Sequence, residues 1–403
     1  NINCTINSIT MNFRTIFVSF CFCLLFANVF GQELVRPVIT GTPFLRIVPD
    51  ARSGGMGETG VATVPDPFSQ FHNPAKYLFM KEGSQAIGLS YIPRFIGYAD
   101  DIFLANAGYF NKFSEKAAVS ASLTYFSFGH FEIEEQMGNE IISQGSFVPN
   151  EFAIDATYSL KLDESFGMSV TGRYIRSDIT NNQMVNNVQL KTGQAVSADI
   201  SGYYTSAPFS IHKNRRTLGF NLKNLGSKIE YSNETGFKYP LPTSLEIGGG
   251  YHFAFGKKDY LSFYAEALKF LVPSTDDQGR LPDENVIAGL FSSFTDAPNG
   301  FSEELKEVVL SLGSEYRYND VLTLRAGYIT QSREKGNKNH ISLGAGVIWN
   351  QFMFDFAYQS PISDDVVSNQ NELLKFSLSY RFGRNTLPEN PEIESLEDGN
   401  SID

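Results

Sequence analysis

The stretch LKFSLSYRF, residues 374–382, decides the fold class. Four large apolar residues alternate in it with small or polar ones: Phe376, Leu378, Tyr380 and Phe382. Successive side chains of a strand point to opposite faces, so this period of two predicts a strand with one apolar and one polar face.

The same alternation extends backwards through most of the chain. It predicts strands near residues 86–92, 103–110, 117–128, 151–161, 165–176, 195–205, 216–224, 245–254, 260–269, 307–318, 321–330, 340–349, 351–359 and 374–382. Most have about 9–11 residues, the length that a tilted strand needs to cross the hydrocarbon of a membrane. About 14 strands is also an even number, as in bacterial outer-membrane barrels.

The connections between these strands alternate in length. Short ones lie near 111–116, 162–164, 255–259, 319–320 and 350, long ones near 129–150, 177–194, 225–244, 270–306 and 360–373, and 206–215 is intermediate. Outer-membrane barrels place short turns at the periplasm and long loops outside. A soluble β-sandwich also alternates, but it gives no reason for this asymmetry. The sequence therefore favours an all-β fold, a transmembrane barrel of antiparallel strands.

Composition agrees with a barrel and indicates which partners and which luminal groups to expect. The 403 residues include 35 Phe and 19 Tyr, which β-sheets favour, and a net charge of −12 argues against nucleic acid as a partner. The predicted inner faces carry both signs of charge: Asp155, Asp199, Glu246, Glu266, Glu315, Asp355, Arg173, Arg317, Arg325 and Arg381. Because a selective pore more often carries one sign, we expect a structural network of ion pairs.

Both ends of the chain fall outside the repeating pattern. Residues 1–10 precede the first methionine and are interpreted as upstream read-through, and residues 11–31 as a secretory signal peptide. The three cysteines (Cys4, Cys21 and Cys23) precede the expected cleavage site at Gln32, so the mature protein should fold without disulfides. Residues 86–383 are the predicted barrel and 384–403 an acidic, disordered tail.

One further stretch breaks the pattern: TPFLRIVPDARSGGMGETGVATVPDPFSQFHNPAKYLF, residues 42–79. Pro67 and Pro74 lack the N–H that a strand ladder needs. The glycines do not form the GxGxxG fingerprint of a dinucleotide site. We expect residues 32–85 to form a segment that lies against or inside the barrel.

Several short motifs of this stretch carry a resemblance. They are Pro43-Phe44-Leu45-Arg46, Pro49-Asp50-Ala51-Arg52, Gly54-Gly55-Met56-Gly57, Gly60-Val61-Ala62 and Asn73-Pro74-Ala75-Lys76-Tyr77. The stretch closely resembles the N-terminus of the PorV family, outer-membrane components of the Bacteroidetes type IX secretion system, within the wider set of FadL-like barrels. His72 stands where this family leads us to expect tryptophan.

The resemblance implies both a fold and a role. The fold is a 14-stranded barrel whose N-terminal segment forms a hatch in the lumen; its candidate residues here are Arg52, Gly54, Gly55, Met56, Gly57, Asn73 and Pro74. The role is to bind cargo through its C-terminal secretion domain and to carry it from the translocon to a sortase-like attachment complex at the cell surface. The implied location is the outer membrane, in contact with its lipid, with both termini on the periplasmic side.

Three function classes remain open. A cargo-binding shuttle comes first, and a FadL-like channel for hydrophobic small molecules is the alternative. A lipid-modifying enzyme would need a nucleophile beside a base, but the five histidines are scattered and no HExxH or nucleophile elbow is present. We therefore expect no enzyme activity, no cofactor and no metal site.

The longest connection, residues 271–306, is the candidate partner-binding loop. It holds Leu290, Phe291, Phe294 and Phe301, more apolar residues than an idle solvated loop needs. Two interpretations remain open: these residues pack down to close the barrel mouth, or they form a surface for cargo or for the rim of the translocon.

Overall fold

The structure is a computed structural model. It describes residues 38–94, 101–137, 140–185, 188–206, 214–234, 236–255, 259–273, 285–296, 300–362 and 373–382. All of these belong to one compact unit, Arg36–Asp403. The read-through, the signal peptide and the acidic tail that the sequence predicts lie outside the described residues.

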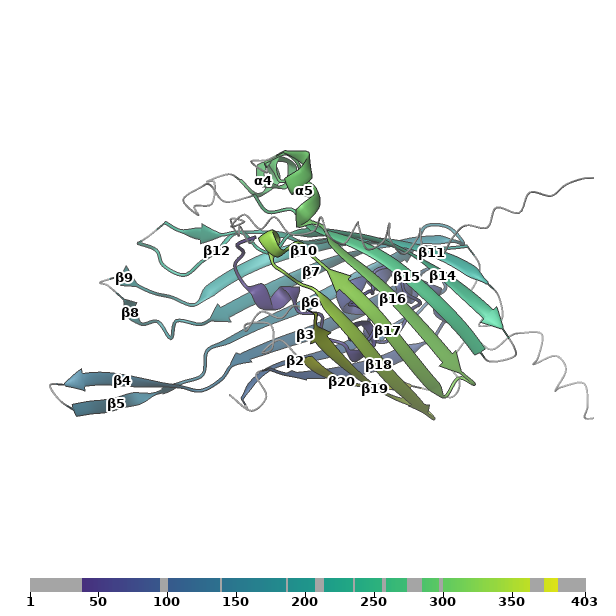
Figure 1. The fold of residues 1–403 in the computed structure, drawn as a ribbon, viewed down its shortest axis with the longest axis horizontal. Coiled ribbons are helices and arrows are strands. Elements are labelled where there is room, and N and C mark those ends of the chain that lie inside the picture. Colours follow the sequence, from purple (N-terminus) through teal and green to yellow (C-terminus); the bar gives the residue numbers. More distant parts are fainter. Residues whose placement is uncertain are drawn as a thin grey trace, which may run out of the picture. The chain divides into compact units, whose positions relative to one another are not determined.

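Fourteen antiparallel strands form a closed barrel, which confirms the predicted fold class (Figure 1). In order around the barrel they are β1 (Gln85–Pro93), β2 (Ile102–Asn111), β3 (Ala117–Phe128), β6 (Asn150–Lys161), β7 (Phe166–Asp178), β10 (Gly193–Thr205), β11 (Arg215–Gly226), β14 (Ser244–Phe255), β15 (Asp259–Phe270), β16 (Val309–Tyr318), β17 (Leu322–Thr330), β18 (His340–Trp349), β19 (Phe352–Pro361) and β20 (Leu373–Phe382). β1 pairs with β20, from Gln85 opposite Phe382 to Tyr91 opposite Phe376, and this pairing closes the ring.

Each strand turns its apolar face outward and its polar face inward. In β20, Phe376 and Tyr380 are exposed, whereas Lys375, Ser377 and Ser379 are buried. This is the reverse of a soluble protein, and it is the arrangement that a barrel surrounded by lipid requires. Closure also gives every strand two neighbours, so no ladder edge is left unpaired.

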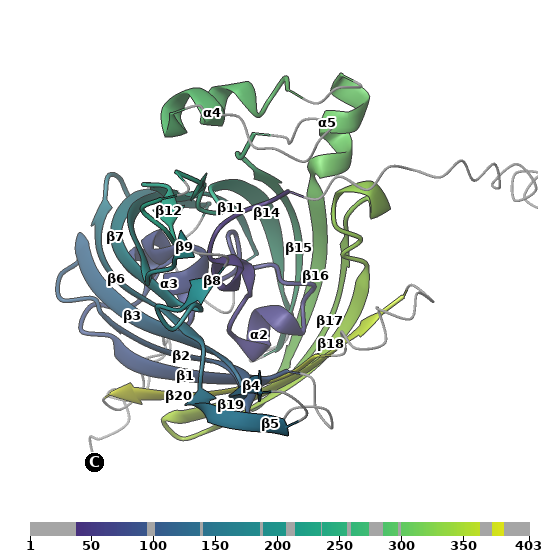
Figure 2. The ribbon, with the colours of Figure 1, turned by 90° about the vertical axis from the view of Figure 1, so that its left-hand side faces the viewer.

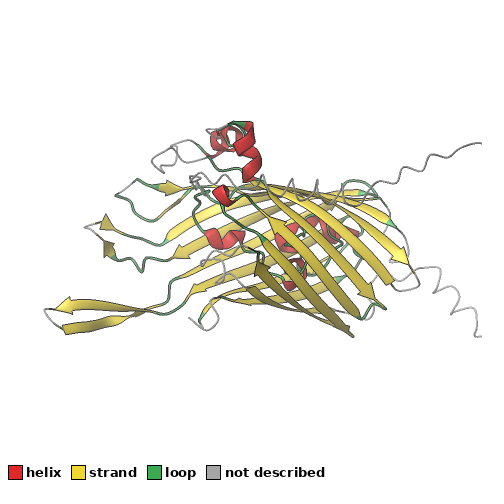
Figure 3. Ribbon diagram, viewed as in Figure 1, coloured by secondary structure: helices red, strands yellow, loops and turns green. Residues whose placement is uncertain are grey.

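The two ends of the barrel differ, as the connection lengths predict (Figures 1 and 3). Tight turns close one end, where Asn319, Asp320 and Asn350 adopt positive φ angles of 51°, 54° and 55°. The long connections meet at the other end and hold short elements of their own. These are β4 (Phe131–Met137) with β5 (Glu140–Phe147), β8 (Met184–Val185) with β9 (Val188–Gln189), β12 (Ile229–Glu230) with β13 (Lys238–Tyr239), α4 (Val286–Ser292), α5 (Phe301–Glu307) and η3 (Arg333–Lys335).

Two details differ from the sequence predictions. Residues 129–150 were expected to form a plain loop, but they hold the β4–β5 hairpin, which reaches beyond the barrel. The strand expected from residue 307 begins at Val309, because α5 continues to Glu307. Among the helices that the structure describes, none is both long and apolar enough to span a membrane.

Residues 38–80, here called the luminal segment, lie inside the ring of strands (Figure 2). They form four short helices: η1 (Pro43–Arg46), α2 (Ala51–Gly54), α3 (Ser69–His72) and η2 (Pro74–Phe79). Asp50 caps α2 by accepting from Ser53 N at 2.8 Å, and Pro74 occupies the start of η2.

The luminal segment runs from one end of the barrel to the other. At the long-connection end, Gly41 N donates to Pro240 O at 2.8 Å, and Phe44 packs in an apolar cluster with Ile92 and Leu104. At the short-turn end, Tyr77 stacks on Phe110 of β2, with ring centroids 4.3 Å apart. The described chain therefore enters the lumen at the long-connection end and leaves it at the opposite end, directly into β1.

Candidate functional site

Arg52 in α2 joins the luminal segment to the barrel wall. Its Nε and Nη2 donate to the two carboxylate oxygens of Glu315 in β16, both at 2.9 Å. Its Nη1 donates to Val64 O at 3.0 Å and to the Asp66 carboxylate. Burial alone would lower the pKa of the guanidinium, but Glu315 and Asp66 raise it well above its usual value. Arg52 thus stays charged and holds one acid of the segment and one of the wall together.

The wall continues this network of charges. Arg325 donates from Nε to Glu315 at 2.8 Å and from Nη1 to Asp355 at 2.6 Å. On the other side of the lumen, Arg173 donates from Nη2 to Asp199 at 2.8 Å. These contacts confirm the predicted network of luminal ion pairs.

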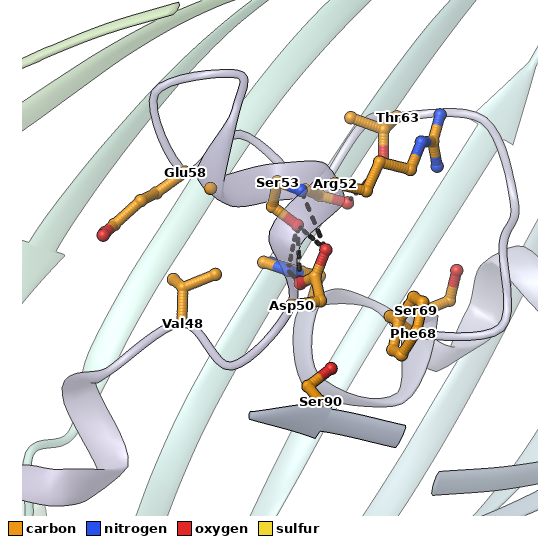
Figure 4. A network of polar contacts seen from close by, with 12 residues as sticks. Val48, Asp50, Arg52, Ser53, Glu58, Thr63, Phe68, Ser69 and Ser90 are labelled. Atoms are coloured by element: carbon orange, nitrogen blue, oxygen red, sulfur yellow. Dashed lines mark hydrogen bonds and ion pairs between the residues drawn. The ribbon is translucent and has the colours of Figure 1, made fainter. Parts of the chain in front are cut away.

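Glu58, which follows the glycine run, anchors the segment to β20 and to the connection that precedes β18. It pairs with Lys338, and one of its oxygens lies 3.5 Å from Lys375 Nζ, which also donates to Val48 O at 2.9 Å. Burial by itself raises the pKa of the Glu58 carboxyl. Lys338 and Lys375 have the larger effect in the opposite direction, and the pKa falls to about 2. The carboxyl is therefore ionised, and the segment is held by charge at this point as well as at Arg52. Figure 4 shows where the Glu58 and Arg52 side chains leave the segment.

The predicted glycine motif packs directly against strand backbone. A Cβ on Gly55 would lie 2.8 Å from Gly344 Cα, and a Cβ on Gly327 would lie 2.0 Å from Gly57 N. Gly57 itself has a φ of 65°, and its added Cβ would lie 2.7 Å from Leu312 O. Glycine is needed on both sides of this contact, because any side chain would push the segment off the wall.

The rest of the glycine motif is equally buried. A Cβ on Gly54 would meet the Lys375 side chain at 2.7 Å. Met56 is 1% exposed, and its carbonyl oxygen lies 2.6 Å from where Gly313 would carry a Cβ.

Asn73 and Pro74 turn the segment towards β1. Asn73 Nδ2 donates to Val61 O and to Gly202 O of β10, both at 2.9 Å, while its Oδ1 accepts from Ala75 N at 3.2 Å. Pro74 begins η2, where its missing N–H leaves no donor unsatisfied. The structure thus brings the predicted motif residues together as one docked unit.

Three residues of the segment form a contact that the sequence reading missed. Ser53 Oγ lies 2.7 Å from His72 Nε2, and the same nitrogen lies 2.8 Å from Asp50 Oδ2 (Asp50 and Ser53 are labelled in Figure 4). A catalytic triad uses both ring nitrogens, one towards the nucleophile and one towards the acid. Here Nε2 faces both partners, and a Cβ on Gly60 would lie 2.1 Å from Nδ1. All three side chains are buried, and their contact joins the α2 and α3 regions of the segment.

The Asp50 carboxylate is the centre of that contact. Burial raises its pKa, but hydrogen bonds from His72 and Ser53 lower it below its usual value. No sequence signal marks the trio, because 19 residues separate Ser53 from His72. Glu58 and Asp66 were also missed; the available signals were a charged residue directly after the glycine run and another between two prolines.

The four residues of the candidate partner-binding loop do not gather into one cluster. Leu290 and Phe291 belong to α4, Phe294 follows it, and Phe301 begins α5. Phe291 is 70% exposed, Phe301 77% and Phe294 44%. They do not pack into the barrel mouth, which was one of the two interpretations.

One cavity lies in the lumen and another on the outer wall. A luminal pocket of about 80 Å³ is lined by apolar residues, such as Phe71, Leu268 and Val309, and by charged ones, among them Glu58, Lys223 and Glu266. A larger, open groove of about 880 Å³ is lined by apolar residues that are exposed on the barrel exterior, including Leu218, Ile247, Leu310 and Leu312. Within the described ranges, no group of three or more His, Cys, Asp or Glu side chains is arranged to hold a metal ion.

Solved structures with a similar fold include two toluene transporters and a FadL homologue. The P. putida toluene transporter TodX is 14% identical, covers 83% of this chain and 98% of its own, and gives a TM-score of 0.50. A toluene transporter from Ralstonia pickettii, TbuX, is 13% identical over 89% of this chain and 100% of its own, with a TM-score of 0.44. A Pseudomonas aeruginosa FadL homologue is 11% identical over 86% and 99%, with a TM-score of 0.43.

Sequence comparison gives the family. No curated protein matches the chain. The family model described as type IX secretion system protein PorV matches residues 30–277, which is more than half of the chain and includes the whole luminal segment. Together with the closed barrel, this match identifies the protein as an outer-membrane β-barrel that belongs to the PorV family of the type IX secretion system.

Proposed function

We propose that this barrel binds secreted cargo through the cargo's C-terminal secretion domain and carries it from the translocon to the sortase-like attachment complex. The observation that carries the proposal is the filled lumen. Arg52, Glu58 and the glycine run dock the luminal segment on strands from several parts of the barrel. A barrel filled in this way acts through its surface, and the luminal segment serves as the hatch.

The orientation belongs to the same proposal. The long-connection end, with the β4–β5 hairpin, faces the cell surface and presents the cargo-binding surface. The short-turn end, where β20 ends at Phe382, faces the periplasm. The described chain begins at the opposite end, at the contact of Gly41 with Pro240, so the periplasmic placement of the N-terminus stays a prediction about residues outside the described ranges.

We propose no catalytic role. Ser53 and His72 are the nucleophile–base pair that an enzyme would need, but both are at most 4% exposed. His72 contacts both Ser53 and Asp50 through the same nitrogen, Nε2, and this contact stabilises the fold of the segment. A luminal pocket of about 80 Å³ also offers little room for an acyl chain.

The alternative is a FadL-like channel for hydrophobic small molecules. One observation favours it: the apolar groove of about 880 Å³ on the outer wall, which touches Gly219 and Gly248. At Gly219 the wall has no side chain, and a Cβ there would lie 2.2 Å from Val61 O of the luminal segment. The groove thus lies directly behind the segment, but the luminal side of the wall is occupied.

Affinity purification of the barrel from outer membranes tests the proposal. Cargo with a C-terminal secretion domain and translocon subunits should copurify. Replacing residues 132–146 of the β4–β5 hairpin by a short turn should reduce the cargo that copurifies. The matched control is Glu164→Lys at the short-turn end, where the side chain is 98% exposed; it should change nothing.

Two results would overturn the proposal. One is a barrel that purifies without cargo and without translocon subunits. The other is uptake of a hydrophobic small molecule, such as toluene, into vesicles containing the barrel, together with unchanged cargo display in a strain without it. The second result would favour the channel.

A further inference from the structure

The connection between β15 and β16 carries two short helices that expose apolar side chains. In and after α4, Ile287, Phe291 and Phe294 are 67%, 70% and 44% exposed. Their spacing of four and then three residues puts them on one face of a helix. In α5, Phe301 and Leu305 are 77% and 57% exposed and share a face in the same way.

The opposite face of α5 is charged, and it is the buried one. Glu303, Glu304 and Glu307 are at most 6% exposed. Lys269 Nζ of β15 lies 2.7 Å from Glu304 Oε2 and 2.6 Å from Glu307 Oε2. Lys335 Nζ of η3 lies 2.7 Å from Glu303 Oε1 and 3.0 Å from Glu307 Oε1. These four contacts fix the rotation of the helix, so its apolar face is held outward.

The inner face of α4 consists of small residues. Gly289 is buried against Pro273, which a Cβ on Gly289 would meet at 2.9 Å, and Ser293 is 0% exposed. Asn285 caps the helix by accepting from Ala288 N at 2.7 Å. α5 is therefore amphipathic in the sense opposite to that of a helix on a soluble protein, whose apolar stripe faces the core, whereas α4 is apolar along most of its length.

The position of the helices shows what lies against this apolar surface. Both views place α4 and α5 outside the ring of strands, and α5 lies next to the start of β16 (Figures 1 and 2). α5 ends at Glu307, and β16 begins at Val309. The next residue, Leu310, points outward into the lipid belt and is 51% exposed. The exposed face of α5 is thus followed in the chain, within a few residues, by the lipid-facing residues of β16.

The charges agree with this position. α4 has the sequence VIAGLFS and carries no charged side chain. The lysine of α5, Lys306, pairs with Glu334 of η3. A surface that meets water would spread charges among its apolar residues, whereas helices at a bilayer surface bury an apolar face and keep the polar one away from the lipid.

We propose that α4 and α5 lie in the lipid–water interface of the outer leaflet, with Ile287, Phe291, Phe301 and Leu305 turned into the lipid. Helices of this kind place the apolar face about 5–10 Å into the boundary between headgroups and acyl chains. The Lys269 and Lys335 contacts with α5 hold the pair beside the barrel, so the helices fix its depth and tilt in the membrane. The competing occupant of this surface is a protein partner.

Tryptophan fluorescence distinguishes lipid from water at these positions. The chain has one tryptophan, so Trp349→Phe gives a background without the fluorophore. Phe291→Trp and Phe301→Trp are then introduced one at a time, and each full-length barrel is reconstituted into bilayers of phosphatidylethanolamine and phosphatidylglycerol. The lipids carry bromines near the headgroup, and acrylamide serves as the quencher from water. Leu310→Trp is the lipid control, and Phe131→Trp, on the β4–β5 hairpin, is the water control.

The proposal expects Phe291→Trp and Phe301→Trp to be quenched strongly by the brominated lipid and weakly by acrylamide, as Leu310→Trp is. Quenching by acrylamide to the level of Phe131→Trp would overturn it. So would acrylamide quenching that falls only when a purified C-terminal secretion domain is added, because the surface would then be a protein-docking site. The four variants change exposed side chains, and heat-resistant migration on gels verifies that each barrel is folded.

Discussion

The luminal segment and the α4–α5 connection both bury charged residues, but with opposite results for their apolar ones. The segment carries charges and glycines into the barrel and satisfies them with partners from the wall, such as Glu315 and Lys375. The connection carries charges too, but it turns Glu303, Glu304 and Glu307 towards the barrel and leaves phenylalanines outside. In one region polar contacts fill a space, and in the other they orient an apolar surface.

This difference shows that burial has a different meaning on each side of the wall. Inside the lumen, a buried charge is paired within a rigid network, so losing a partner strands another charge. Outside, Phe291 and Phe301 contribute little to folding, because their side chains are 70% and 77% exposed. Substitutions in the two regions should therefore differ greatly in their effect on stability.

Arg52→Ala should have the largest effect. It leaves Glu315 and Asp66 buried without their shared cation, and breaking a buried pair in this way costs about 3–5 kcal/mol. Unfolding in urea, followed by loss of heat-resistant migration, measures it. Arg176→Ala is the control, because its side chain is 33% exposed and pairs with Asp178. Equal midpoints for the two variants would show that the segment is not held by charge.

Leu378→Arg should come next. The side chain faces outward from the middle of β20, and a cation near the bilayer midplane costs about 2–4 kcal/mol. Ser379→Arg directs the same cation into the polar lumen, where Ser379 lies 1% exposed, and should be tolerated better. The yield of folded barrel in the outer membrane is the measurement. If both variants lose the same amount, the assignment of faces in β20 is wrong.

Gly327→Ala should have an intermediate effect confined to the luminal segment. The new methyl carbon would lie 2.0 Å from Gly57 N, and overpacking of this kind costs about 1–3 kcal/mol. The segment should then become accessible to protease while the barrel stays closed. Gly172→Ala is matched to it, because no atom lies within 4 Å of the added carbon. Identical digestion of the two variants would contradict the glycine contact.

Phe291→Ala combined with Phe294→Ala should have the smallest effect on folding. Surface substitutions of this kind stay within about 0.5 kcal/mol, since no packing is lost. Phe44→Ala in the luminal segment, where the side chain is 1% exposed, is the contrast and should cost about 3–5 kcal/mol. The temperature at which each variant loses its heat-resistant migration on gels compares their stabilities. A double variant as unstable as Phe44→Ala would mean that the two phenylalanines are packed.

The barrel could be predicted because its signal repeats. Alternation in β20 places Phe376 outside and Ser377 inside, and the same period of two recurs in strand after strand. The luminal charges followed from the same rule, since a charged residue on the polar face of a closed barrel has only other luminal groups to meet. The β4–β5 hairpin escaped prediction, because the alternation of Phe131, Glu132, Ile133 and Glu134 is short and ends at Glu135 and Gln136.

The contacts of the two sites depend on distant parts of the chain, and local sequence does not encode them. Arg52 was singled out by its motif, but its partner Glu315 lies 263 residues away. The apolar residues of the α4–α5 connection were noticed by composition alone. The direction in which they point depends on Lys269 and Lys335, which belong to other elements.

The position of the luminal segment has a consequence for the order of assembly. The segment precedes β1 in the chain, and the ring closes only when β1 pairs with β20. β20 also bonds the segment directly: Ser377 Oγ accepts from Ala51 N at 2.8 Å, and Lys375 Nζ donates to Val48 O. Closing the wall and seating the segment therefore share contacts, because the last strand of the described barrel bonds the first described part of the chain. A chain that has not yet placed its segment lacks part of the surface on which β20 docks.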